Sequence, residues 1–82
     1  MDDQPHGFAV VILGRTWLCK TRLNVRDLLV ELDVYLEPDS RLEFGAWLEG
    51  RHYARIIRFY SSPRWDSNPS VTIYKVGEAR GY

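Results

Sequence analysis

The chain has few of the residues that stabilise small domains through cross-links or metals. Its 82 residues include one cysteine, Cys19, which excludes an internal disulfide framework. The two histidines, His6 and His52, are far apart in the sequence, and with one cysteine they do not supply the four ligands of a zinc site. We therefore expect no metal and no other cofactor, and a small apolar core has to stabilise the domain.

Long apolar runs are also missing. The longest, 8–13 (FAVVIL), has six residues, about a third of a membrane span. The acidic start, MDDQPHG, is unlike the basic, apolar start of a secretory signal. The sequence thus predicts a cytoplasmic protein without membrane contact, in which one domain at 8–77 lies between a disordered N-terminal tail at 1–7 and a C-terminal tail at 78–82.

The chain carries no net charge, with eleven basic and eleven acidic side chains. This balance argues against a protein that coats nucleic acid by bulk charge. The charges are unevenly distributed, because residues 1–50 hold five basic and nine acidic side chains, whereas residues 51–82 hold six and two. The acidic stretch 27–49 and the basic stretch 51–64 either pair with each other in the fold or face a partner.

Hydropathy patterns predict an α+β domain with a mainly antiparallel sheet of about five strands and one short helix, in the order β-β-β-α-β-β. The run 8–13 is typical of a strand buried on both faces, and Gly14-Arg15 then turns the chain into a strand over 16–22. Ser40 and Glu43 have capping-box spacing before a helix over 41–49, in which Gly45 is unfavourable. The segment 71–76 is the expected last strand.

The segment 28–37 fits two structures. Its strict alternation favours a half-buried strand with an acidic outer face made of Glu31, Asp33, Tyr35 and Glu37. A helix capped by Asn24 is the alternative, since helical spacing also relates Val25, Leu28, Leu29, Leu32 and Leu36. We prefer the strand.

The segment 51–60 (RHYARIIRFY) is similarly ambiguous. A helix would separate its apolar and arginine-bearing faces more cleanly, but its β-branched and aromatic residues favour a strand, which we prefer. The segment 61–70 is rich in serine, proline, aspartate and asparagine and is expected to be a loop.

No catalytic arrangement is evident, and we do not expect an enzyme. His52 is the one histidine outside the tail; it stands between Arg51 and Tyr53, and we expect a partly exposed surface residue rather than a general base, which needs positioned partners. Trp65 is the main candidate for a binding residue, because it stands in a polar loop far from any apolar pattern. The alternative is that its indole covers an edge of the core. The expected partner-binding residues are Trp65, Arg64, Tyr60, Arg58, Arg55, Glu31, Asp33, Tyr35 and Glu37.

These features predict a small protein-binding module that docks on a larger protein and modulates or inhibits it. Inhibitors, immunity proteins and anti-defence proteins of phages and bacteria have this size and lack catalytic motifs. A nucleic-acid binder that uses the arginines and aromatic residues of 51–65 is the alternative. A homodimer remains open as well, because an edge strand could pair across a twofold axis.

Overall fold

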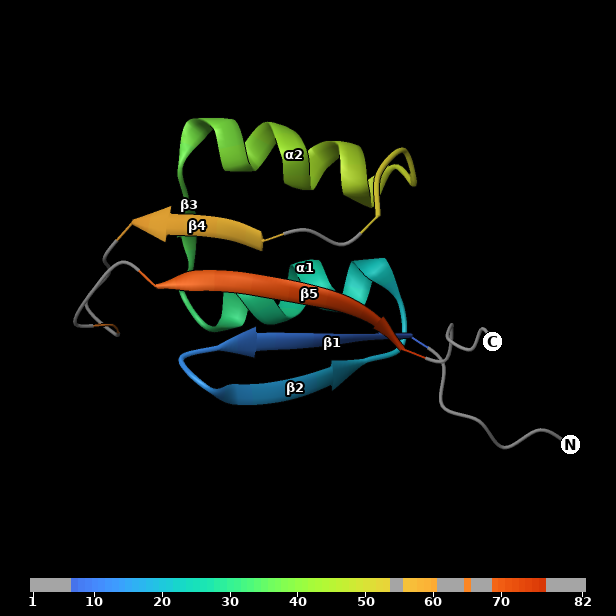
Figure 1. Cartoon of the computed structure of the whole chain (residues 1–82), viewed down its shortest axis with the longest axis horizontal. Coiled ribbons are helices and arrows are strands. Elements are labelled where there is room, and N and C mark those ends of the chain that lie inside the picture. Colours follow the sequence, from blue (N-terminus) through green and yellow to red (C-terminus); the bar gives the residue numbers. More distant parts are fainter. Residues whose placement is uncertain (1–6, 54–55, 61–64, 66–68, 77–82) are drawn as a thin grey trace, which may run out of the picture.

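A five-stranded antiparallel sheet and two helices form the domain, in a computed structural model that describes residues 7–53, 56–60, 65 and 69–76 (Figure 1). The elements are β1 (Gly7–Ile12), β2 (Arg15–Cys19), α1 (Arg22–Glu31), β3 (Tyr35–Leu36), α2 (Pro38–Leu48), β4 (Ile56–Tyr60) and β5 (Ser70–Val76). The strand order is β2-β1-β5-β4-β3, and every neighbouring pair is antiparallel. The predicted α+β class with a mainly antiparallel sheet is confirmed.

Both helices contribute to one core on one face of the sheet. Alternate residues of the long strands point into this core: Phe8, Val10 and Ile12 from β1, Ile57 and Phe59 from β4, and Val71 and Ile73 from β5. The helices add Val25, Leu29, Phe44 and Trp47. The other face carries no helix in the described part of the chain, so the expectation that β1 is buried on both faces was wrong. Ala9 and Val11 on that face are half-buried.

The segment that we expected to be a strand over 28–37 forms most of α1, a turn and the short strand β3. Helix α1 is capped by Thr21, whose hydroxyl accepts a hydrogen bond from the backbone N–H of Asn24 at 3.0 Å. Helical packing wins because it buries Val25 and Leu29 against the sheet and leaves Val30 exposed. The order of elements is therefore β-β-α-β-α-β-β.

Helix α1 ends in a Schellman motif in which Asp33 occupies the position where glycine is usual. Asp33 takes the left-handed conformation with φ 64° and donates its N–H to the carbonyl of Val30 at 3.0 Å. The N–H of Val34 bonds the carbonyl of Leu29 at 3.0 Å. This turn separates the helix from β3.

The remaining predicted elements agree with the structure apart from their ends. A helix and a last strand are present as α2 and β5, and the preferred strand in 51–60 is confirmed as β4. Pro38 stands at the start of α2, earlier than the expected capping box, and Ser40 is buried and accepts the N–H of Arg58 at 3.1 Å. The first turn comprises Leu13 and Gly14 rather than Gly14-Arg15.

Candidate functional site

The predicted basic and aromatic binding residues are only partly visible in the structure. Arg58 lies exposed on the uncovered sheet face, next to the buried Ile57 and Phe59. Tyr60 pairs with Tyr35 where β4 meets β3. Arg55 and Arg64 lie outside the described residues. The structure therefore brings Tyr35 and Tyr60 together from different stretches of the sequence.

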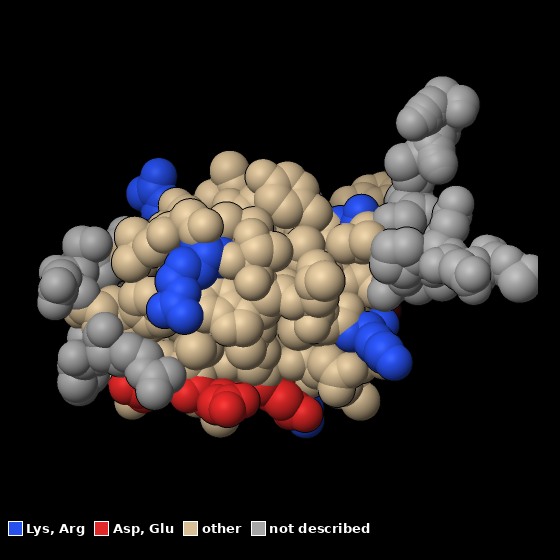
Figure 2. All heavy atoms as spheres, turned by 90° about the horizontal axis from the view of Figure 1, so that it is seen from below, with Lys and Arg blue, Asp and Glu red and all other residues tan. Residues whose placement is uncertain are grey.

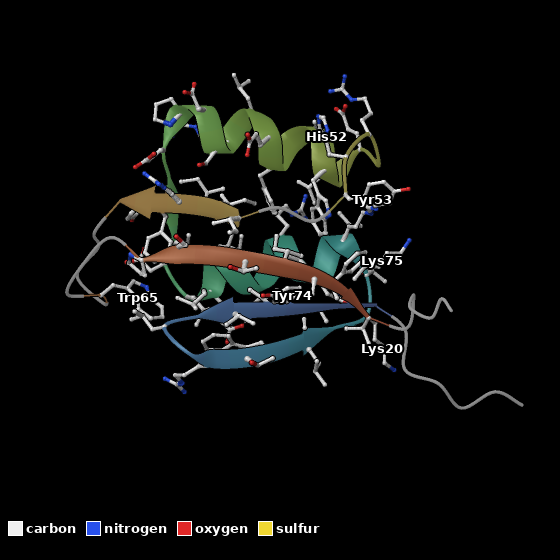
Figure 3. The ribbon with its side chains drawn as sticks, viewed as in Figure 1. Lys20, His52, Tyr53, Trp65, Tyr74 and Lys75 are labelled. Carbon is white, nitrogen blue, oxygen red and sulfur yellow. The ribbon has the colours of Figure 1, made fainter. Side chains whose placement is uncertain are left out.

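Trp65 packs on the domain. Its Nε1–H donates a hydrogen bond to the carbonyl of Leu32 at 3.1 Å, and its ring meets Phe59 edge-on with centroids 5.8 Å apart. The indole is half-buried and lies at the opposite end of the sheet from Lys75 (Figure 3). It thus covers an edge of the core, which is the alternative that the sequence left open. Its remaining surface borders a small hollow with Arg15, Trp17 and Leu32.

The expected acidic strand face does not exist, because its four residues belong to different elements. Glu31 ends α1, Asp33 lies in the following turn, Tyr35 is in β3 and Glu37 immediately precedes α2. The side-chain hydrogen bond with Asp33, and then the charge of Asp33, raise the pKa of Tyr35 above its ordinary value. These residues form no continuous strip of charge along a strand.

On the face shown in Figure 2, acidic side chains form a row along one edge, whereas basic ones are scattered. Two of the ion pairs join near neighbours, Arg26 with Asp27 at 3.4 Å and Arg51 with Glu49 at 2.8 Å. Exposed local pairs of this kind contribute little to stability and leave room for other partners.

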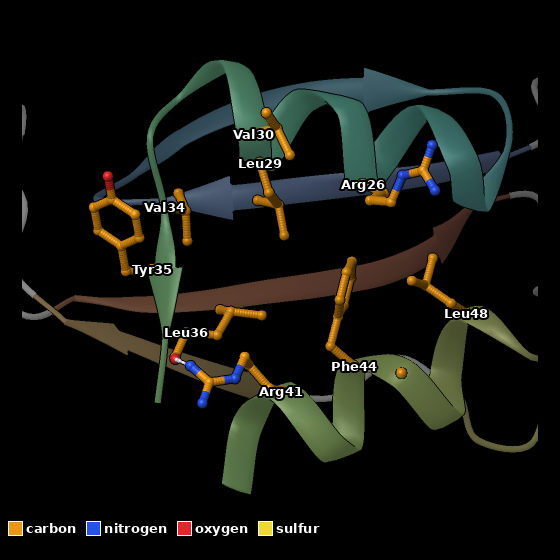
Figure 4. Close-up of a pocket in the computed structure, with 10 residues that line it drawn as sticks. Arg26, Leu29, Val30, Val34, Tyr35, Leu36, Arg41, Phe44 and Leu48 are labelled. Atoms are coloured by element: carbon orange, nitrogen blue, oxygen red, sulfur yellow. Dashed lines mark hydrogen bonds between the residues drawn. The ribbon is translucent and has the colours of Figure 1, made fainter. Parts of the chain in front are cut away.

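A groove between α1 and α2, lined by described residues, is a candidate site that the sequence did not predict (Figure 4). Its volume is about 410 Å³. Residues at helical spacing on α1 form one wall, and residues at helical spacing on α2 form the other. Val34 and the strand β3 close one end. The lining residues are Arg26, Leu29, Val30, Val34, Tyr35, Leu36, Arg41, Phe44, Gly45 and Leu48. Among the predicted site residues whose side chains the structure describes, Tyr35 alone belongs to this lining.

The α2 wall of the groove has an apolar surface that the core holds in place. Phe44 stacks on the buried Trp47 with centroids 5.5 Å apart and an interplanar angle of 20°. Trp47 in turn meets Phe8 of β1 edge-on at 5.0 Å. Phe44 therefore presents a fixed apolar surface to the groove.

Two guanidinium groups provide the charge of the groove. Arg26 lies on the α1 wall and Arg41 on the α2 wall, and the described lining includes no carboxylate. The Nη1 of Arg41 donates to the carbonyl of Leu36 at 3.1 Å, which fixes the side chain at the end of the groove near β3. The site is thus an apolar slot with a cation on each wall.

Gly45 has no structural reason to be glycine. It lies inside α2, where glycine costs about 1 kcal/mol relative to alanine, and its φ is not in the left-handed region. A Cβ built on it would meet nothing within 4 Å among the atoms that the structure describes outside the adjoining helical backbone. Packing therefore does not require the missing side chain, and its absence keeps the groove wide.

Other chemistry is not apparent in the described ranges. No cluster of three or more histidine, cysteine, aspartate or glutamate side chains in them could hold a metal ion. No helix there is both long and apolar enough to cross a membrane. His52 follows α2 as an exposed residue beside the exposed Tyr53 (Figure 3).

Comparison with known proteins adds no relative: no family model, no curated protein and no solved structure matches this chain.

Proposed function

We propose that this protein is a binding module that docks on a larger protein by taking apolar side chains of the partner into the groove between α1 and α2. The observation that supports this most directly is the groove itself, with an unneeded helical glycine in its wall. A helix position that gives up stability without a packing benefit is expected where the open space has a use.

The shape of the groove suits a segment of protein chain. Its volume is within the range of about 300–1,000 Å³ that is common for binding sites. Two helices form its long walls, and grooves of this kind accept the apolar side chains of an amphipathic segment. Val30 and Tyr35 at its border are 73% and 53% exposed, so apolar surface continues beyond the slot itself.

A blocked groove tests the proposal. Gly45→Trp should fill the slot without disturbing the core, because the space beside Gly45 is open. Leu42→Trp is the matched control, since Leu42 is on the same helix, 75% exposed and outside the lining. Circular dichroism and thermal unfolding would show that both variants fold.

A random peptide library displayed on phage supplies the probe. We expect selected peptides to bind the wild-type protein and Leu42→Trp equally and to bind Gly45→Trp at least about tenfold more weakly in fluorescence titrations. Peptides that bind Gly45→Trp as well as the wild type, or a selection that yields no binder, would contradict the proposal.

A further inference from the structure

The groove also indicates the chemistry of its occupant, an inference that depends on the proposed function. We infer that the partner segment carries a carboxylate beside its apolar side chains, and that this carboxylate pairs with Arg41 on the α2 wall, at the end of the groove next to β3. The occupant is thus an acidic, apolar peptide segment of another protein.

Arg41 is already positioned for such a contact. Its Nη1 bond to the carbonyl of Leu36 uses one of the five N–H donors of a guanidinium, so others can reach a ligand. The planar fork binds a carboxylate through two parallel hydrogen bonds, and less entropy is lost when the side chain is already held. A carboxylate at this end of the groove would have its apolar neighbours near Phe44 and Leu48, which line the same wall.

Arg26 lines the same groove from α1, toward the other end from Arg41 (Figure 4). Its contact with Asp27 is an exposed pair at 3.4 Å, with side chains 54% and 66% exposed, and such pairs are weak. A carboxylate bound in an apolar groove is screened less by water than Asp27 is. We therefore expect Arg26 to strengthen binding, with a smaller effect than Arg41.

The distribution of acidic side chains supports an acidic partner segment. The stretch 27–49 contains seven acidic side chains and one basic one, which by itself suggests a basic partner. In the structure none of those acidic residues belongs to the described groove lining. Arg41, and Arg26 just before the stretch in the sequence, do belong to it. The groove should therefore prefer an acidic partner, although the charge of 27–49 by itself suggests a basic one.

Charge reversal provides the test, with peptides selected as above. Arg41→Glu should weaken binding of an acidic peptide about tenfold or more, and replacing the peptide carboxylate by lysine should restore binding to that variant. Arg26→Glu is the second variant, because the described contact of its side chain is an exposed pair with Asp27 rather than a bond to the backbone. Arg51→Glu is the control, since Arg51 is 67% exposed and outside the lining.

The outcomes separate the two proposals. Selected peptides that are blocked by Gly45→Trp but show no acidic enrichment and no response to Arg41→Glu or Arg26→Glu would overturn the carboxylate inference and leave the groove as a docking site. Loss of affinity in Arg51→Glu equal to that in Arg41→Glu would also overturn it, because the effect would then be one of net charge. If no selected peptide binds Gly45→Trp more weakly than the wild type, both the proposed function and the carboxylate inference are overturned.

Discussion

The guanidinium of Arg22 lies 4.7 Å from the centroid of the Trp47 ring and also donates a hydrogen bond to the backbone carbonyl of Trp47. The same group lies 5.2 Å from the ring of Phe8. Arg22 begins α1, Trp47 is near the end of α2 and Phe8 is in β1. One side chain therefore links both helices to the sheet, close to the positions of Arg26 and Leu48 in the groove walls.

Arg22→Ala should lower the free energy of unfolding by about 1–3 kcal/mol, because it removes a cation–π contact and a hydrogen bond to a carbonyl. Arg22→Lys should recover part of this loss, since an ammonium keeps the charge but not the planar fork. Urea unfolding followed by circular dichroism measures both variants. A stability of Arg22→Ala equal to that of the wild type would show that the contact contributes nothing in solution.

Trp65→Phe should destabilise the domain by about 1 kcal/mol, because it removes the hydrogen bond to Leu32 and keeps most of the ring contact with Phe59. Trp65→Ala should cost more, about 2 kcal/mol, since the ring packing is lost as well. Tyr74→Phe, at an exposed position on the uncovered sheet face, is the matched control and should change little. Unchanged stability of Trp65→Ala would mean that the indole does not cover the core in solution.

Leu13→Asn should stabilise the protein by about 0.5–1 kcal/mol. Leu13 and Gly14 connect β1 and β2 with φ values of 51° and 79°, as in a type I′ turn, for which Asn-Gly is the preferred pair. Leu13 is 57% exposed, so little packing is lost. Thermal unfolding would show the gain as a higher Tm, and a lower Tm would contradict the turn assignment.

Stability should fall in alkali through Cys19. Burial raises the pKa of its thiol, so above the ordinary value of 9.0 the unfolded chain loses the proton before the folded protein does. The free energy of unfolding therefore declines from that pH until the folded-state pKa is passed. Cys19→Ala should show a smaller decline than the wild type between about pH 8 and about pH 10 in urea unfolding. An equal decline with pH in the wild type and Cys19→Ala would contradict a raised pKa of the Cys19 thiol.

Tyr35 shifts stability in the same direction, but from a higher pH. Asp33 raises its pKa above the ordinary value of 10.0, so its contribution is present at neutral pH and is lost only above that value. Since wild type and Cys19→Ala share Tyr35, the difference between their slopes reports on the thiol.

Local sequence patterns were enough to predict β1, β5 and the helix α2. The length and β-branched content of the apolar run between two glycines favoured a strand, an alternation before Gly77 favoured the last strand, and a helical face after Pro38 favoured the helix. Segment 28–37 satisfied two periodicities, so its structure depended on which face could be buried. Helix α1 places Val25 and Leu29 in the common core, a benefit that arises only when the sheet is present.

The binding residues were harder to predict than the fold class. Trp65 was singled out because no pattern explained it, and only its contacts with Leu32 and Phe59 showed that it covers the core. The groove combines α1, β3 and α2, so no single stretch of sequence contains its pattern. Gly45 was visible in the sequence as a weak point of a helix, but the open space beside it was not.

The sequence by itself determined the zero net charge, the uneven distribution of that charge, the lack of internal disulfides and the positions of most strands, because these depend on composition and short-range periodicity. Tertiary structure decided that 22–31 is a helix, that the acids of 27–49 stay out of the described groove lining, and that Arg26 and Arg41 enter it. The physical reason is that burial and the sorting of charge depend on which surfaces meet, and distant segments meet only in the folded chain.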